Sequence, residues 1–141
     1  IIDRYLQLIS TGEKVMAHVV EDQYWRELGS LEGYLQVHQE LFEMQIAPFQ
    51  GIQGYGKPVV HESARLGAGT RFAGMVCIGA DCQLEREVMI QGSVIWNQVQ
   101  IRAGCSIRGS IIGDGVAVTE SLEGEVVGTK GRVKLAVDSG Q

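Results

Sequence analysis

The sequence has few cysteines, few positive charges and no long apolar run, and each shortage argues against a class of protein. Its net charge is −5 and its lysines and arginines form no cluster, which argues against a nucleic-acid partner but not against a small phosphorylated ligand. No apolar run approaches the roughly 18 residues that cross a bilayer, and no signal peptide opens the chain, so we expect no membrane partner. The three cysteines, Cys77, Cys82 and Cys105, lack C-x-x-C spacing. We expect them to be buried, reduced thiols in a cytoplasmic protein.

The composition that remains is that of a folded domain with many tight turns. Hydrophobic residues make up 45% of the 141 residues and charged residues 21%, which is typical of a globular protein. The 19 glycines predict frequent turns. The length allows one ordinary domain, or a small domain with an appendage. Because the sequence begins with Ile1 rather than methionine, we expect it to be a piece of a longer protein.

A repeat is the strongest pattern in the sequence. The stretch IQGSVIWNQVQIRAGCS, residues 90–106, is followed by IRGSIIGDGVAVTESLE, and the two align with a period of 17. Around them, aliphatic or aromatic residues recur at steps of six, namely Val60, Leu66, Phe72, Ile78, Leu84, Ile90, Ile95, Ile101, Ile107, Ile112 and Val118. A second small or aliphatic residue follows each of the first ten by four positions: Ala64, Thr70, Val76, Cys82, Val88, Val94, Val99, Cys105, Ile111 and Val116. Neither a helix nor a plain hairpin sheet produces this spacing.

This spacing predicts a parallel β-helix. Each six-residue step makes one short strand and one corner, three steps close a turn of about 18 residues, and turns stack about 4.8 Å apart. The first residue of each step is predicted to point inward, and the small second residue to fit where the corner narrows. Two steps, 90–95 and 107–112, are one residue short and fall on the same third of the triangle, so the missing residues stack at one corner. We therefore predict a β-helix over residues 60–122 with a little over three turns.

The flanking segments are predicted to form a different kind of structure. Residues 1–46 are interpreted as a helix that ends before Gly12, a Val-rich strand over 14–20, and a second helix capped by Ser30. The second helix is expected to direct inward Leu31, Tyr34, Leu35, Leu41 and Phe42. Three such elements cannot bury a core of their own, so we predict the end of a larger α/β domain. Residues 47–59 are expected to be a linker, and residues 123–141 a polar cap or an extended hairpin around 128–131.

Two resemblances give this arrangement a family. The six-residue pattern resembles the hexapeptide-repeat proteins, which implies a left-handed parallel β-helix and a mainly β fold. The stretch YWRELGSLEGYLQVHQELF, residues 24–42, resembles the end of the catalytic domain in sugar-phosphate nucleotidylyltransferases such as mannose-1-phosphate guanylyltransferase. Members carry Trp-x-Asp-x-Gly-Thr there, followed by a helix that opens with Tyr-Leu. At those positions this chain has Trp25, Glu27, Gly29, Ser30, Tyr34 and Leu35. The two resemblances together cover about residues 1–118.

The resemblance implies a nucleotidyltransferase that makes an NDP-sugar and pyrophosphate from an NTP and a sugar-1-phosphate, with Mg²⁺ as cofactor. In the family the aspartate helps to hold Mg²⁺ on the phosphates. Here Glu27 occupies that position, with a carboxylate that is one methylene longer. The family's Gly-rich nucleotide-binding loop, with its Thr-Arg pair, has no match in this chain. No catalytic or nucleotide-binding residue is therefore identified, and we expect the chain alone to be inactive.

Two other functions use the same kind of coil. A hexapeptide acyltransferase needs a general-base histidine, for which His61 is the candidate, and a non-catalytic β-helix serves as a scaffold. Only His61 lies on the predicted coil, so a zinc-binding histidine triad is not predicted; we expect His18 to be a core residue and His38 a helix-surface residue. Trp96 is expected to point outward and touch a helix, the linker or a second subunit, and Asp114 to close a turn. Because the open end of the stack needs a cover, we expect a homo-oligomer formed through the β-helix.

Overall fold

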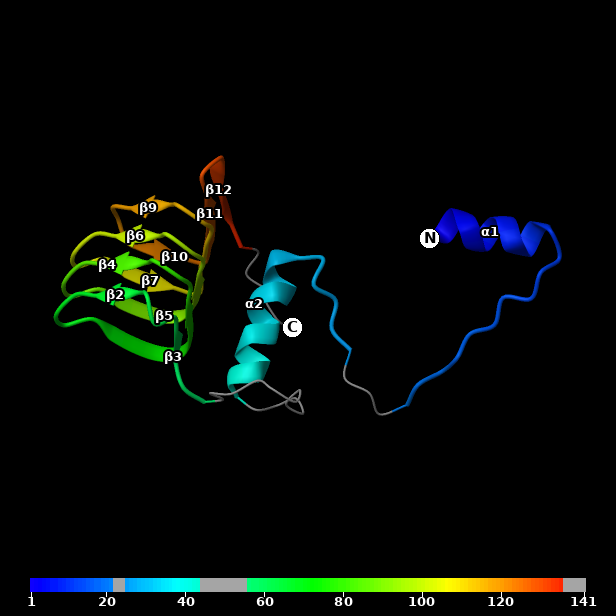
Figure 1. Ribbon diagram of the computed structural model, residues 1–141, viewed down its shortest axis with the longest axis horizontal. Coiled ribbons are helices and arrows are strands. Elements are labelled where there is room, and N and C mark those ends of the chain that lie inside the picture. Colours follow the sequence, from blue (N-terminus) through cyan, green and yellow to red (C-terminus); the bar gives the residue numbers. More distant parts are fainter. Residues whose placement is uncertain (22–24, 44–55, 136–141) are drawn as a thin grey trace.

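The described part of the chain is mainly a coil of short β-strands. The computed structural model describes residues 1–21, 25–43 and 56–135. Its helices are α1 (Ile2–Ser10) and α2 (Leu31–Phe42). Its strands are β1 (Val59–Val60), β2 (Arg65–Leu66), β3 (Arg71–Ile78), β4 (Gln83–Leu84), β5 (Met89–Ile95), β6 (Gln100–Ile101), β7 (Ser106–Arg108), β8 (Ile111–Ile112), β9 (Ala117–Val118), β10 (Leu122–Glu123), β11 (Glu125–Gly128) and β12 (Gly131–Lys134). Figure 1 shows α2 alongside the coil and α1 set apart from it. Within the described ranges, no helix is long and apolar enough to cross a membrane.

The coil has three faces, each built from stacked parallel strands. The first face contains β1, the second halves of β3 and β5, then β8 and β11. The second face contains β2, β4, β6 and β9. The third face contains the first halves of β3 and β5, then β7 and β10. The predicted parallel β-helix is confirmed, but it makes about four turns rather than a little over three.

The inward side chains stack into one continuous core. On the second face, for example, Leu66, Leu84, Ile101 and Val118 lie in register above one another. The inward isoleucines of the middle turns are almost fully buried, whereas Leu66 in the first turn is 43% exposed. Burial of these apolar side chains is the main stabilising contribution to such a coil. Within the described residues the core is therefore closed along its length and open at its first turn.

The two short steps lie at the corner between the third and first faces, as predicted. In the first turn this corner holds two residues, Gly74 and Met75, and the strand pairing shifts there. In the later turns a single glycine takes their place: Gly92, Gly109 and then Gly124. All four corner glycines have φ between 51° and 63°, a conformation that other residues rarely adopt.

The shortened corner also changes which small residues point inward. Because this corner is one residue shorter, the first inward side chain after it comes one position earlier in the sequence than predicted. Ser93 and Ser110 are fully buried at these positions, whereas Val94 and Ile111 point outward, so the prediction that those two residues fill the narrow corner is wrong. Ser110 N–H donates to Ser93 Oγ at 3.1 Å, and Glu125 N–H donates to Ser110 Oγ at 3.2 Å. The hydroxyl oxygen of each buried serine thus accepts a hydrogen bond from the backbone of the next turn.

The coil continues beyond the predicted boundary at residue 122. Leu122 stacks on Ile107 and Val127 on Ile112, both 15 residues apart rather than 17. The boundary is wrong because the connection from β9 to β10 is shorter, which hides the six-residue pattern. The hairpin predicted around residues 128–131 is confirmed, since β11 pairs antiparallel with β12 and Gly128 lies opposite Gly131.

The segments before the coil follow the prediction in part. Gly12, with φ of 76°, ends α1 as expected, and its N–H donates to Ile9 O. The strand predicted over 14–20 is wrong. A strand needs a hydrogen-bonded neighbour, and none of the described strands pairs with these exposed residues. Most of the predicted linker, residues 47–55, lies outside the described residues, and Val59 already belongs to β1.

Candidate functional site

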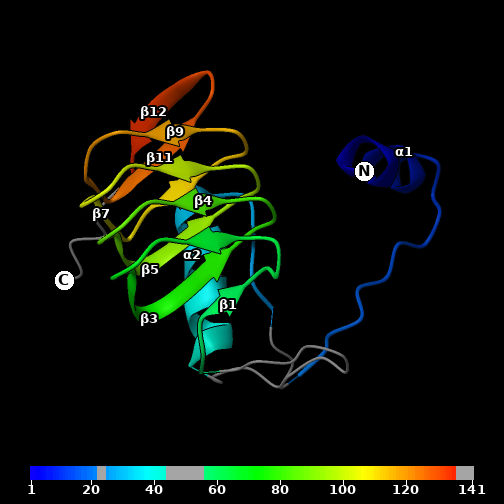
Figure 2. The ribbon, with the colours of Figure 1, turned by 60° about the vertical axis from the view of Figure 1, so that its left-hand side comes forward.

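Helix α2 lies along the first face of the coil and so stands beside several turns at once. It contacts β3 and β5, and Figure 2 shows it behind the stacked strands. The outward side chains of this face include Cys77, Val94 and Ile111, which are in register. Val94 and Ile111 are only 4% and 3% exposed. Because they point away from the core of the coil, we attribute their burial to α2.

Aromatic rings join one side of α2 to the coil. The rings of Tyr34 and Trp96 meet edge to face with their centroids 6.3 Å apart, and His38 lies against Tyr34 at 4.5 Å. Trp96 remains 43% exposed. The prediction that Trp96 points outward and touches a helix is therefore confirmed. Such an edge-to-face pair adds about 0.5–1.5 kcal/mol beyond the area that it buries.

The other side of α2 faces the glycine corners across a shallow groove of about 390 Å³. The groove is lined by Glu32, Leu35, Gln36, Gln39, Met75, Gly92, Gly109, Gly124 and Leu135. One turn of a helix rises about 5.4 Å and one turn of the coil about 4.8 Å, so successive turns of α2 follow successive corners. Leu31, however, is exposed, and its predicted inward position is wrong. It lies in the first helical turn, where the Ser30 cap holds the chain.

The segment before α2 is held on the helix by three contacts. Ser30 Oγ accepts the N–H of Gly33 at 3.0 Å, which confirms Ser30 as the N-cap. A Cβ atom on Gly33 would lie 2.8 Å from the carbonyl oxygen of Glu27, so the segment packs closely over the first turn. Arg26 forms an ion pair with Glu40, which is only 7% exposed. No sequence pattern links those two residues, which are fourteen positions apart.

Glu27 lies in this segment with its side chain exposed. Its carboxylate folds back over the turn, because a Cβ atom on Gly29 would lie 3.0 Å from Glu27 Oε1. Among the residues that the structure describes, no group of three or more histidine, cysteine or acidic side chains could hold a metal ion. Glu27 can therefore supply one carboxylate oxygen to a cation, and further ligands would have to come from elsewhere.

The three histidines lie at separate places in the structure. His61 is exposed on the first coil corner, as predicted, with Nδ1 2.9 Å from Ser63 Oγ. His18 is exposed, so its predicted core position is wrong: the surrounding residues are extended and bury nothing. His38 is half-buried against Tyr34 rather than a simple surface residue.

The cysteines and Asp114 have structural roles. The cysteines are free; Cys82 and Cys105 are buried in the core, while Cys77 is half-buried on the outer side of the first face. Burial raises the pKa of all three thiols. The carboxylate of Asp114 accepts the N–H of Asn97 at 2.8 Å, so it joins two neighbouring coil turns rather than closing its own.

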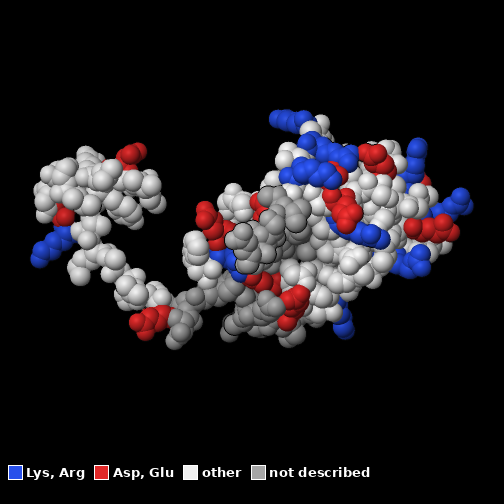
Figure 3. Space-filling model, turned by 180° about the vertical axis from the view of Figure 1, so that it is seen from behind, with Lys and Arg blue, Asp and Glu red and all other residues white. Residues whose placement is uncertain are grey.

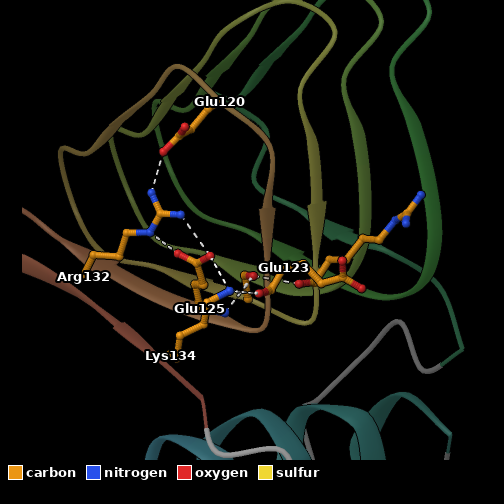
Figure 4. A network of polar contacts seen from close by, with 7 residues as sticks. Glu120, Glu123, Glu125, Arg132 and Lys134 are labelled. Atoms are coloured by element: carbon orange, nitrogen blue, oxygen red, sulfur yellow. Dashed lines mark hydrogen bonds and ion pairs between the residues drawn. The ribbon is translucent and has the colours of Figure 1, made fainter.

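A charged network that was not predicted from the sequence covers the last turn of the coil (Figure 4). The carboxylate of buried Glu125 accepts hydrogen bonds from Arg132, one of them at 2.9 Å, and pairs with Lys134 at 2.9 Å. Arg132 also reaches Glu120 at 2.5 Å. The bonds from Arg132 and then Lys134 lower the pKa of Glu125 to about 2. The hairpin therefore closes this end of the stack with paired charges.

A signal for this network is present in the sequence. Glu123 and Glu125 precede the hairpin turn at alternate positions, and Arg132 and Lys134 follow it at alternate positions. In an antiparallel hairpin, alternate residues of each strand lie on the same face, so acidic residues on one strand meet basic residues on the other. Glu125 indeed lies opposite Lys134.

Comparison with known proteins places the coil in a family. Residues 55–137 match the family described as the GMPPB C-terminal domain, a range that contains the whole coil and its hairpin. The chain is also 30% identical over 102 residues to mannose-1-phosphate guanylyltransferase from Mycobacterium tuberculosis. That alignment covers 72% of this chain but only 28% of the relative, so the chain corresponds to a minor part of that protein's length. On the match over residues 55–137, the chain belongs to the GMPPB C-terminal domain family.

Proposed function

We propose that the chain is the C-terminal assembly and regulatory portion of a nucleotidyltransferase that makes an NDP-sugar and pyrophosphate from an NTP and a sugar-1-phosphate. The observation that carries this proposal is the order of two features: the Trp25–Ser30 segment with its helix comes first, and a coil of the GMPPB C-terminal domain family follows. The relative from Mycobacterium tuberculosis, by its name, transfers a guanylyl group to mannose-1-phosphate. GTP and mannose-1-phosphate are therefore the first substrates to test, in a cytoplasmic enzyme.

The exposed apolar side chains of residues 1–21 and 25–28 support a larger parent domain. None of the residues of α1 is buried, and Ile2, Leu6 and Ile9 are all more than half exposed. Figure 3 shows α1 projecting away from the coil with a surface that carries few charges. Apolar area of this kind normally lies against another element. We take these residues to be the end of the α/β catalytic domain, which would supply the nucleotide-binding half.

Glu27 fits a role in holding Mg²⁺, although the residues that the structure describes form no cluster of metal-binding side chains around it. Mg²⁺ in phosphoryl-transfer sites is usually bound by one or two carboxylates, with substrate phosphates and water as its other ligands. When bound, Mg²⁺ would neutralise charge on the phosphates as an oxygen of the sugar-1-phosphate attacks the α-phosphorus and pyrophosphate leaves. In this reaction Glu27 would contribute one carboxylate oxygen to the ion. Its side chain is exposed, and its backbone is packed against the first turn of α2. The nucleotide-binding half would contribute the rest of the site.

The coil would serve assembly as a homo-oligomer, with the left-handed sense of the hexapeptide-repeat proteins. One end of the stack is covered by the β11–β12 hairpin and its charges, while the first turn leaves Leu66 exposed. An apolar layer, and strand edges that no other described strand pairs with, favour contact with another subunit at that end. A scaffold without catalysis, or an acyltransferase that uses His61, would share this coil. The exposed His61 bonded to Ser63 gives no specific support to acyl transfer.

The proposal is tested by pyrophosphate release from GTP and mannose-1-phosphate with Mg²⁺. We expect no release by residues 1–141 alone, and release by the native protein if mass spectrometry finds the nucleotide-binding half attached. In that protein Glu27→Gln is expected to lower kcat at least about tenfold, as loss of a charged ligand to the metal would. Its matched control, Glu62→Gln, removes an exposed coil carboxylate and should leave the rate unchanged. A native protein that starts near residue 1, or binds CoA, would overturn the proposal in favour of a scaffold or an acyltransferase.

A further inference from the structure

Two sets of contacts meet on α2, one to the coil and one to the segment that carries Glu27. On the coil side α2 contacts β3 and β5, its Tyr34 ring meets Trp96, and the outer side chains Val94 and Ile111 are buried. The second set is the Ser30 cap, the close approach at Gly33, and the ion pair between Arg26 and Glu40. Tyr34 N–H donates to Ser30 O at 3.1 Å, so the ring pair lies one helical turn from the cap.

Gly33 shows that the second set constrains the segment closely. Alanine is a better helix former than glycine, so glycine in the first turn of α2 is locally unfavourable. A side chain there would place its Cβ 2.8 Å from Glu27 O and 3.0 Å from Ser30 Oγ, closer than such atoms normally approach. The packing of the Glu27 backbone on the helix therefore excludes the better helix former.

We propose that α2 transmits the position of the coil to the Glu27 carboxylate, with Trp96 and Gly33 as positioning residues. This inference rests on the proposed function, because only there does Glu27 hold a metal. The path is short. Trp96 contacts Tyr34, which lies in the helical turn that begins at Ser30. Gly33 belongs to the same turn, and the carbonyl group of Glu27 packs against it. The path joins the Glu27 segment to the coil without passing through the residues between α2 and β1. A subunit contact that displaces Trp96 would thus alter the metal site.

The first test measures amide hydrogen exchange in residues 26–33 of the present chain. We expect Trp96→Ala to raise exchange there about threefold to tenfold, which corresponds to the free energy of one aromatic pair, with no change in β4, β6 and β9 on the second face of the coil. Trp96→Phe keeps a ring and should restore protection. Gly33→Ala should raise exchange at residues 26–29 while the coil is untouched. Val133→Ala is the matched control, since Val133 is an exposed apolar residue on β12, whereas α2 contacts β3 and β5. Unchanged exchange in Trp96→Ala would overturn the proposal.

The second test measures the Mg²⁺ concentration for half-maximal nucleotidyl transfer by the complete enzyme. Trp96→Ala and Gly33→Ala should both raise it several-fold, Trp96→Phe should restore it, and Val133→Ala should leave it unchanged. Raised exchange with an unmoved Mg²⁺ dependence would show that the coil holds the segment but not the metal site, which contradicts the proposal. Absence of transfer in the wild-type complete protein would instead refute the proposed function, while the exchange result would still decide whether the coil orders residues 26–33.

Discussion

At the residue scale, close backbone approach decides where the coil tolerates only glycine. A Cβ atom on Gly67 would lie 2.4 Å from the carbonyl carbon of Glu85, in the next turn, so the two turns would have to separate. We expect Gly67→Ala to lower the free energy of unfolding by about 2–3 kcal/mol. Gly113→Ala is the matched control, because its nearest neighbour would be Val127 O at 3.5 Å, an ordinary contact. Urea unfolding measures both, and equal midpoints for the two variants would contradict this account.

Glu125 gives the coil a specific dependence on acid. Its pKa is lowered from 4.5 to about 2 by the hydrogen bonds from Arg132 and Lys134. A lowered folded-state pKa means stability that is present above about pH 4.5 and is lost as the pH falls toward 2. We expect Glu125→Gln to unfold at a lower temperature than wild type at pH 7, and the difference to shrink between pH 4.5 and 2. Thermal melts across this range measure it, and a gap independent of pH would show that the charge is unimportant.

At the element scale, the corner between the third and first faces is expected to accept a deletion. Met75 is the extra residue of the first turn, and the later turns manage with one glycine at that corner. Deleting Met75 should therefore keep the coil and its circular dichroism, at a cost of about 2–3 kcal/mol for the lost buried side chain. Deleting Ala80 is the control, since the corner that holds it keeps its full length in every turn. We expect that deletion to abolish cooperative unfolding, and similar urea curves for the two would be evidence against the stacked-corner interpretation.

The elements that repeat were predictable from the sequence, and those that depend on single contacts were not. The six-residue period determines the coil because each inward position meets the same environment in every turn. The last turn was missed because a shorter connection between β9 and β10 moved Leu122 out of the period. The strand at 14–20 was predicted from its valines alone, although a strand also requires a partner. At the candidate site, Ser30 was predictable as a cap, whereas the Arg26–Glu40 pair joins residues that no local pattern relates.

At the scale of the whole molecule, the chain divides into a coil that supports itself and an N-terminal part that does not. The coil buries its core with its own residues, and its last turn is closed by paired charges. The N-terminal part buries almost nothing: within residues 1–21 only Leu8 is even half-buried. Stability and the proposed metal ligand thus lie in different parts of the chain, and α2 is the element that they share.

This division predicts that the N-terminal residues can be removed without cost to the coil. A chain that starts at Glu21 keeps Arg26, its partner Glu40 and all of α2, so we expect its free energy of unfolding to match that of the full chain within about 0.5 kcal/mol. Removing residues 131–141 instead takes away β12 and leaves Glu125 buried without its two cations, so the urea midpoint should fall clearly. The two truncations can be compared by urea unfolding followed by circular dichroism. If removal of residues 1–20 destabilises the coil as much as removal of the hairpin, the N-terminal part packs on the coil, and its exposed apolar residues no longer favour a larger parent domain.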